Sequence, residues 1–199
     1  MIRSFLAVDL PPAVKERLAG IIALLQPGSS GIKWVNPDQV HLTLKFFGSI
    51  PQETVDRIAG AVSETMRLGR PFDLNLRGVG GFPNIRRPRV IWAGLGGNLA
   101  ELQNLWLRLE EAFFGIGIPR ETRPFHPHLT LGRNKTGAPN EKLFLSLSHW
   151  NEPEVEPFVV RDLHLFKSDL RPGGPIYSVI QSFPLRGLEE SGSLSSAEK

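Results

Sequence analysis

The same four-residue sequence, His-Leu-Thr-Leu, occurs twice in this chain, at positions 41–44 and again at positions 128–131. In an extended strand, residues two apart point to the same face. Each copy therefore predicts a strand that carries a histidine and a threonine on one face and two leucines on the other. A strand buried on both faces would normally be apolar at all four positions. If the two strands lie side by side, two imidazoles and two hydroxyls face one cleft.

Coincidence is the first alternative for this repeat, since threonine is common in strands. The chain has five histidines and six threonines among 199 residues. A threonine two positions after two of the histidines is expected by chance in roughly one such chain in a hundred, before the leucines are also required. We therefore interpret the repeat as functional.

Two imidazoles and two hydroxyls suit the opening of a cyclic phosphodiester. This reaction needs a base that deprotonates water and an acid that protonates the leaving alkoxide, and histidine serves both roles because its ordinary pKa is about 6.5. The hydroxyls of Thr43 and Thr130 can donate hydrogen bonds to the phosphate oxygens, where charge develops in the transition state. The scheme requires no metal and no other cofactor.

A zinc site is the main chemical alternative, with His41, His126 and His128 as three imidazole ligands. Pro127 separates the last two histidines, threonine is a poor zinc ligand, and neither motif contains Asp or Glu. We therefore expect His126 to orient the turn into the strand instead. For His149 and His164, which lie outside the motifs, we expect surface or structural roles.

Three further features near the motifs are candidates for substrate contact. Arg133 could bind phosphate or a base, although simple alternation places it on the face opposite His128, unless a bulge breaks the pattern. Phe47 shares the face of His41 by alternation and could stack on a base or pack in the core. The basic run Arg86, Arg87 and Arg89 could attract RNA phosphates or be a solvated loop.

Strand and helix patterns alternate along the chain, and several strands are short and bounded by Pro or Gly, which favours an α+β fold over a doubly wound parallel sheet. The strand, helix, motif-strand order of the first half recurs loosely in the second half, so an internal duplication is plausible. Asn98 and Glu101 have the spacing of a capping box. The pattern predicts strands at 5–8, 41–48, 72–76, 89–93, 128–133, 159–166 and 176–180, and helices that begin after Pro11, Pro51 and Asn98.

Composition excludes several other classes of protein and of functional site. The chain has no cysteine, which excludes disulfides, thiolate metal sites and a cysteine nucleophile, and which fits a cytoplasmic protein. No apolar run approaches the roughly 20 residues of a membrane-spanning helix, and the N-terminal sequence lacks the layout of a secretory signal. We expect one domain over residues 1–188 and a disordered polar tail over 189–199.

The paired motifs and their flanking segments resemble the 2H phosphoesterase superfamily, and in particular its RNA 2′,3′-cyclic phosphodiesterase branch, historically named 2′-5′ RNA ligase. The similarity extends from about Arg3 to Ile180 and includes the segments 34–35, 41–48, 81–83, 87–92 and 125–133. It implies a bilobal α+β fold in which two pseudo-symmetric antiparallel-sheet lobes with outer helices enclose a central cleft. It further implies that His41 is the general acid, that His128 is the general base, and that Thr43 and Thr130 bind the phosphate.

The expected function is hydrolysis of RNA 2′,3′-cyclic phosphate ends to 2′-phosphates, by a monomer that acts on tRNA-like fragments or oligonucleotides. If a 5′-hydroxyl replaces water, the same chemistry forms a 2′-5′ linkage without ATP. One alternative is a non-catalytic module that binds RNA ends, although simple anion binding would need only Lys or Arg. Another alternative is a cyclic phosphodiesterase that acts on a small nucleotide.

Overall fold

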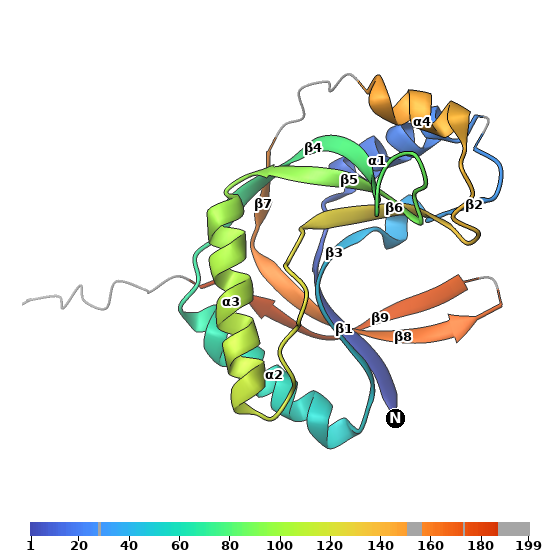
Figure 1. Ribbon diagram of the computed structural model, residues 1–199. Coiled ribbons are helices and arrows are strands. Elements are labelled where there is room, and N and C mark those ends of the chain that lie inside the picture. The colour runs from blue at the N-terminus through green and yellow to red at the C-terminus, as the bar shows by residue number, and fades with distance from the viewer. Residues whose placement is uncertain (28, 151–156, 173, 187–199) are drawn as a thin grey trace, which may run out of the picture.

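Residues 1–27, 29–150, 157–172 and 174–186 are described by the computed structural model, which contains helices and antiparallel strands (Figure 1). The elements in chain order are β1 (Ile2–Asp9), α1 (Pro12–Leu25), β2 (Ile32–Trp34), the 3-10 turn η1 (Pro37–Gln39), β3 (His41–Ile50), α2 (Gln52–Arg67), β4 (Phe72–Phe82), β5 (Val90–Gly97), α3 (Leu99–Gly115), β6 (His128–Asn134), α4 (Glu141–Ser148), β7 (Phe158–Val160), β8 (Asp162–Arg171) and β9 (Gly174–Pro184).

The strands form a curled sheet in the order β7-β4-β5-β6-β3-β1-β8-β9, and the short strand β2 pairs with β6. Each of these pairings is antiparallel, which confirms the predicted α+β class. The sheet has two halves of four strands, and they meet at β3 and β6, the two motif strands. The halves are pseudo-symmetric in this order, because each motif strand is the innermost strand of its half.

Helices cover one face of the sheet, and they are exchanged between the halves (Figure 1). Helix α1 follows β1 but packs against α4, near the half that contains β4 and β5, whereas α3 follows β5 but packs against α2 in the other half. The core between sheet and helices is one continuous cluster that includes Leu6, Leu42 and Leu129 from the central strands. This exchange and the shared core hold the two halves together.

The helical periodicity of the sequence locates the buried faces well. The apolar residues at helical spacing in α1 are all buried: Val14, Leu18, Ile21, Ile22 and Leu25. In α2, Val55, Ile58, Val62 and Met66 are buried, and Ala59, on the same side, packs at the edge of the core. A run of apolar residues at helical spacing buries one stripe of a surface helix. Within the described residues, no helix is both long and apolar enough to cross a membrane.

Several details of the predicted elements are wrong. Segment 159–166 forms two strands, and these lie in opposite halves because β7 pairs with β4 while β8 pairs with β1. Asn98 precedes α3, but its side chain makes no capping hydrogen bond. Strand β2 and helix α4 were not predicted, since each is short. The predicted disordered tail over 189–199 lies outside the described residues.

A buried ion pair joins the first motif strand to α3. The Nζ of Lys45, in β3, donates to Glu110 Oε1 at 2.6 Å and to the carbonyl of Pro119 at 3.1 Å. The other carboxylate oxygen of Glu110 accepts from the backbone N–H of Glu121 at 2.7 Å. Both charged side chains are buried, at 8% and 7% exposure. The pair therefore fixes β3 against α3 and against the segment that leads to β6.

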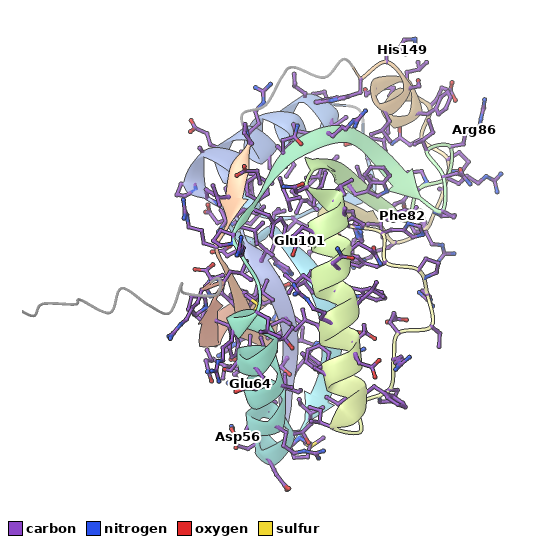
Figure 2. The ribbon with its side chains drawn as sticks, turned by 90° about the vertical axis from the view of Figure 1, so that its left-hand side faces the viewer. Asp56, Glu64, Phe82, Arg86, Glu101 and His149 are labelled. Atoms are coloured by element: carbon purple, nitrogen blue, oxygen red, sulfur yellow. The ribbon has the colours of Figure 1, made fainter. Side chains whose placement is uncertain are left out.

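We predict that Lys45→Met destabilises the fold by about 3–5 kcal/mol, because it leaves the Glu110 carboxylate buried without its partner. Replacing both residues, as in Lys45→Met with Glu110→Leu, should recover most of this loss, because no unpaired charge remains. Urea unfolding curves measure the changes. The matched control is Glu64→Ala. Glu64 lies on α2 (Figure 2), and its exposed ion pair with Arg67 contributes at most about 1 kcal/mol. Equal losses in Lys45→Met and Glu64→Ala would contradict the structural role of the buried pair.

Candidate active site

The two motifs lie on neighbouring strands at the centre of the sheet. Leu42 of β3 is the direct antiparallel partner of Leu129 of β6. This register places His41 across from Thr130 and Thr43 across from His128. The two leucines are buried at 1% and 0% exposure, whereas the histidines and threonines are half-buried. We call the face that carries these two histidines and two threonines the motif face; the helices cover the other face.

The last residue of each motif forms a β-bulge. In β3, Thr43 pairs with Ala7 and Lys45 pairs with Leu6, so Leu44 between them has no partner on β1. In β6, Thr130 pairs with Trp92 and Gly132 pairs with Ile91, so Leu131 has no partner on β5. An extra residue of this kind shifts the alternation of the strand by one position. The fifth residue after each motif histidine therefore returns to the motif face.

This bulge overturns the predicted face of Phe47. Phe47 packs perpendicular to Phe113 of α3, with ring centroids 5.1 Å apart, on the helix-covered side. Its neighbour Phe46 occupies the motif face instead; it is 59% exposed and lies 5.4 Å from the ring of Phe5. Simple alternation fails here because it assumes a regular strand, and we therefore replace Phe47 with Phe46 as the aromatic candidate for substrate contact.

The second bulge turns Arg133 toward the motif face. The bulge breaks the simple alternation that would place Arg133 opposite His128, so the fifth position after His128 returns to the motif face. Burial lowers the pKa of His128 and raises the pKa of Tyr177. The exposed Arg133 is near enough to both groups for its positive charge to lower the pKa of each. His128 and Tyr177 come from opposite halves of the sheet. Arg133 therefore lies where it could contact a substrate between the halves.

Both motif histidines are oriented in the same way. The Nδ1 of His41 lies 2.8 Å from the carbonyl oxygen of Gln39, and the Nδ1 of His128 lies 2.7 Å from the carbonyl oxygen of His126. A carbonyl only accepts, so Nδ1 carries the proton in each ring and the neutral tautomer is fixed. Nε2 is then the nitrogen free to take up or release a proton. His126 thus orients His128 through its backbone carbonyl and not through its imidazole.

Aromatic rings that the sequence did not single out surround the two imidazoles. Phe5 of β1 stacks on His41 with centroids 4.6 Å apart, and Tyr177 of β9 meets the same imidazole edge-on at 5.3 Å. Phe82, at the end of β4, meets His128 edge-on at 5.1 Å. These rings restrict the rotation of the imidazoles and cover part of their surface. Their positions depend on strand pairing, which the sequence alone does not give.

Burial lowers the pKa of both motif histidines below the ordinary value, because the imidazolium loses solvation. The nearby charges differ between the two. Around His41, the Asp9 carboxylate raises the pKa and the ammonium of Lys15 lowers it. Around His128, the charges of Arg133 and His126 both lower the pKa. The two sites have similar geometry, but the charges beside His128 favour its neutral form.

Helix α3 connects the surroundings of the two motifs. The indole Nε1 of Trp106 donates to the carbonyl oxygen of the bulged Leu44 at 3.2 Å. The Trp106 ring also stacks on Phe125, with centroids 5.0 Å apart and planes inclined by 4°. Phe125 immediately precedes His126, whose carbonyl orients His128. One buried side chain thus contacts the bulge of the first motif and the segment that leads to the second.

The remaining histidines have local partners. His149 Nδ1 lies 3.0 Å from the carbonyl of Leu145, and His164 lies between Asp162 at 3.1 Å and the Ser182 hydroxyl at 2.8 Å. Over the described part of the chain, no three His, Cys, Asp or Glu side chains are grouped as a metal would require. The three-histidine zinc alternative therefore gains no support from the geometry.

A family model described as LigT like Phosphoesterase matches residues 8–92 and 97–177, which include both motifs. The chain belongs to the LigT-like phosphoesterase family. It is 36% identical over 184 residues to the RNA 2′,3′-cyclic phosphodiesterase of Methanothermobacter thermautotrophicus, covering 92% of this chain and 99% of the relative. It is 38% identical over 189 residues to the protein of the same name from Thermus thermophilus, covering 93% and 91%.

Solved structures agree with this family. The crystal structure of a Thermus thermophilus protein superposes with a TM-score of 0.74 at 33% identity, covering 94% of this phosphoesterase and 99% of that chain. Escherichia coli LigT complexed with 3′-AMP gives a TM-score of 0.74 at 26% identity, covering 92% and 98%. The resemblance inferred from the paired motifs is confirmed, and this chain is an enzyme of the phosphoesterase class.

We predict that Arg133→Gln raises the pKa of His128 and leaves the pKa of His41 unchanged, because the Arg133 charge disfavours the imidazolium only at His128. Proton NMR titration of the two imidazole Hε1 signals measures both values. Arg120→Gln is the matched control, because Arg120 pairs with Glu111 on the surface. An unchanged pKa of His128 in Arg133→Gln would contradict the placement of Arg133 on the motif face.

Proposed function

We propose that this phosphoesterase hydrolyses RNA 2′,3′-cyclic phosphate ends to 2′-phosphates by acid–base catalysis between two histidines. The observation that carries the proposal is the matched anchoring of His41 and His128. Each imidazole has Nδ1 occupied by a backbone carbonyl, on adjacent strands, so that Nε2 is available for proton transfer. The names of the two relatives support the RNA substrate.

In this mechanism Nε2 of His128 accepts a proton from water as the water oxygen bonds to phosphorus. The bond between phosphorus and the ribose 3′-oxygen breaks, and Nε2 of protonated His41 gives its proton to that oxygen. Attack in line with the leaving oxygen needs the base and the acid on opposite sides of the phosphate. The products are a 2′-phosphate and a free 3′-hydroxyl, and the proton count balances.

Charge supports this division of roles between the histidines. The acid must be protonated before the reaction. Burial, the largest effect, lowers the pKa of His41, while the Gln39 carbonyl and the Asp9 carboxylate act in the opposite direction and favour the protonated form. The base must be neutral, and Arg133 and His126 favour the neutral form of His128. The motif sequences alone are identical and could not distinguish the two roles.

The threonines are suited to hold the phosphate between the histidines. Within the described residues, the hydroxyls of Thr43 and Thr130 have no hydrogen-bond partner, although both side chains are half-buried on the motif face. Each can therefore donate to a phosphate oxygen without breaking an internal bond. A neutral donor aimed at developing negative charge stabilises the transition state.

A 5′-hydroxyl that replaces water would give a 2′-5′ linkage without ATP, because the cyclic ester already stores the activation. We expect hydrolysis to dominate, since water is far more abundant. A small cyclic nucleotide is a second candidate substrate, and the 3′-AMP complex of Escherichia coli LigT shows that a related scaffold binds a nucleotide. We further propose that the protein acts as a cytoplasmic monomer without a metal or other cofactor.

We predict that His41→Ala and His128→Ala each lower kcat by about 10²–10⁴-fold, because general acid and general base catalysis each contribute about that much. Thr43→Ala and Thr130→Ala should have smaller effects, since each removes one neutral donor. The assay is turnover of a short RNA with a 2′,3′-cyclic phosphate, in excess chelator. His149→Ala is the control, because the hydrogen bonds of His149 within the described residues are to the end of α4. Retention of more than about a tenth of the activity in either motif variant would rule out the acid–base scheme.

We predict a bell-shaped pH dependence of kcat/KM whose maximum lies below about pH 6.5, the ordinary pKa of histidine. On the acid side the rate falls as His128 becomes protonated, and on the alkaline side it falls as His41 loses its proton. Burial lowers both pKa values, so both limbs move to lower pH. The kcat profile should lie at higher pH, because the bound phosphate anion favours the imidazolium. A rate that rises continuously with pH would leave no role for a histidine acid.

A further inference from the structure

The loop between β4 and β5 carries three arginines that the proposed mechanism does not use. We call Arg86, Arg87 and Arg89 the basic hairpin; all three are exposed. The sequence has no acidic residue between Asp73 and Glu101, and none between Glu121 and Glu141. These two segments meet in the sheet, because β5 pairs with β6. These two paired segments therefore carry only positive charges.

The basic hairpin is connected directly to the second motif strand. The carbonyl of Arg89 accepts from the backbone N–H of Asn134 at 3.0 Å, and the next residue, Val90, pairs with Arg133. At the other end of the loop, Phe82 contacts the imidazole of His128. Figure 2 shows Arg86 on the loop beyond Phe82. The loop thus begins next to His128 and ends next to Arg133.

The loop is ordered by its own contacts. The side-chain oxygen of Asn84 accepts from the backbone N–H groups of Arg86 and Arg87 at 3.1 and 3.0 Å. The Arg86 guanidinium lies 4.7 Å from the ring centroid of Phe144 in α4. An ordered loop presents its charges at fixed positions, and less entropy is then lost when a ligand binds.

Six cations elsewhere in the described residues form ion pairs with carboxylates, whereas the cations of this region do not. Lys15, Lys45, Arg67, Arg108, Arg120 and Lys167 each pair with a carboxylate. Among the described residues, no carboxylate lies within ion-pair distance of the basic hairpin, Arg133 or Lys135. The chain carries 23 Lys and Arg against 20 Asp and Glu, a net charge of +3. These five cations exceed that net charge, so the rest of the chain is net negative.

We propose that the basic hairpin binds the backbone phosphates of the nucleotides that precede the terminal one in an RNA substrate. The inference rests on the proposed function, and it extends the substrate from a terminal nucleotide to a strand. Unpaired arginines match phosphates because the guanidinium can donate two parallel hydrogen bonds. Because Phe82 lies between the His128 imidazole and the loop that carries Arg86, we assign the hairpin to the nucleotides that precede the terminal one.

The test compares two substrates with one terminal group. One is uridine 2′,3′-cyclic phosphate, and the other is a hexanucleotide that ends in the same group. The variant Arg86→Gln, Arg87→Gln, Arg89→Gln should lower kcat/KM for the hexanucleotide about tenfold or more at low salt and leave the mononucleotide unchanged. The slope of log kcat/KM against log salt should also decrease in magnitude, by about 0.7 for each lost phosphate contact.

The matched control removes the same charge elsewhere, in Arg17→Gln, Arg67→Gln, Arg70→Gln, on or next to helices α1 and α2 of the opposite face. It should alter neither substrate by more than about twofold, because distant exposed charges are screened by salt. Arg87→Gln alone is a milder variant that keeps the Arg86 contact with Phe144. It should give a smaller loss, still confined to the hexanucleotide. Melting temperatures confirm that each variant is folded.

Equal losses for both substrates would overturn the proposal, because the hairpin would then act by positioning Phe82 and His128. Unchanged kinetics for both substrates would overturn it as well. A wild-type protein that turns over neither substrate would refute the proposed function. In that case, fluorescence anisotropy with a labelled hexanucleotide that ends in a 2′-phosphate still tests the hairpin. Equal affinity of the wild type and the triple hairpin variant would then reject the RNA contact.

Discussion

The cross-strand pair of Leu42 and Leu129 is the contact on which the site depends. It joins the two halves of the sheet, and its antiparallel register places each histidine opposite the threonine of the other motif. A shift of one residue would turn one motif toward the core, because side chains alternate along a strand. Burial of the leucines against the helices opposes such a shift, so the hydrophobic core determines the geometry of the polar face.

Equivalent bulges then give two identical motifs different neighbours. Each bulge returns the fifth residue after its histidine to the motif face, and this residue is aromatic in one half and cationic in the other, Phe46 and Arg133. Trp106 binds the carbonyl of one bulge and stacks on the segment before the second histidine. The symmetric backbone thus supplies matched imidazoles, while the charged residues around them differ, which is the basis of the acid and base roles that we propose.

The sequence predicted the parts of this site that depend on local periodicity. The paired tetrapeptides located His41 and His128, and the helical spacing located the buried faces of α1 and α2. It failed where pairing between distant segments decides the outcome. Alternation could not reveal the bulges that exchange Phe47 for Phe46 and turn Arg133 to the motif face, and it could not separate β7 from β8, which pair with different strands. The rings of Phe5 and Phe82 beside the histidines were missed for the same reason.

The central claim is that two histidines of opposite role open a cyclic phosphate without a metal, with His41 on the side of the leaving 3′-oxygen. Phosphorus NMR of the product from an oligonucleotide 2′,3′-cyclic phosphate, digested in excess chelator, tests this claim most directly. The account predicts a 2′-phosphate as the main product. A predominant 3′-phosphate would reverse the assignment of acid and base, and no product until a divalent metal is added would contradict the two-histidine mechanism itself.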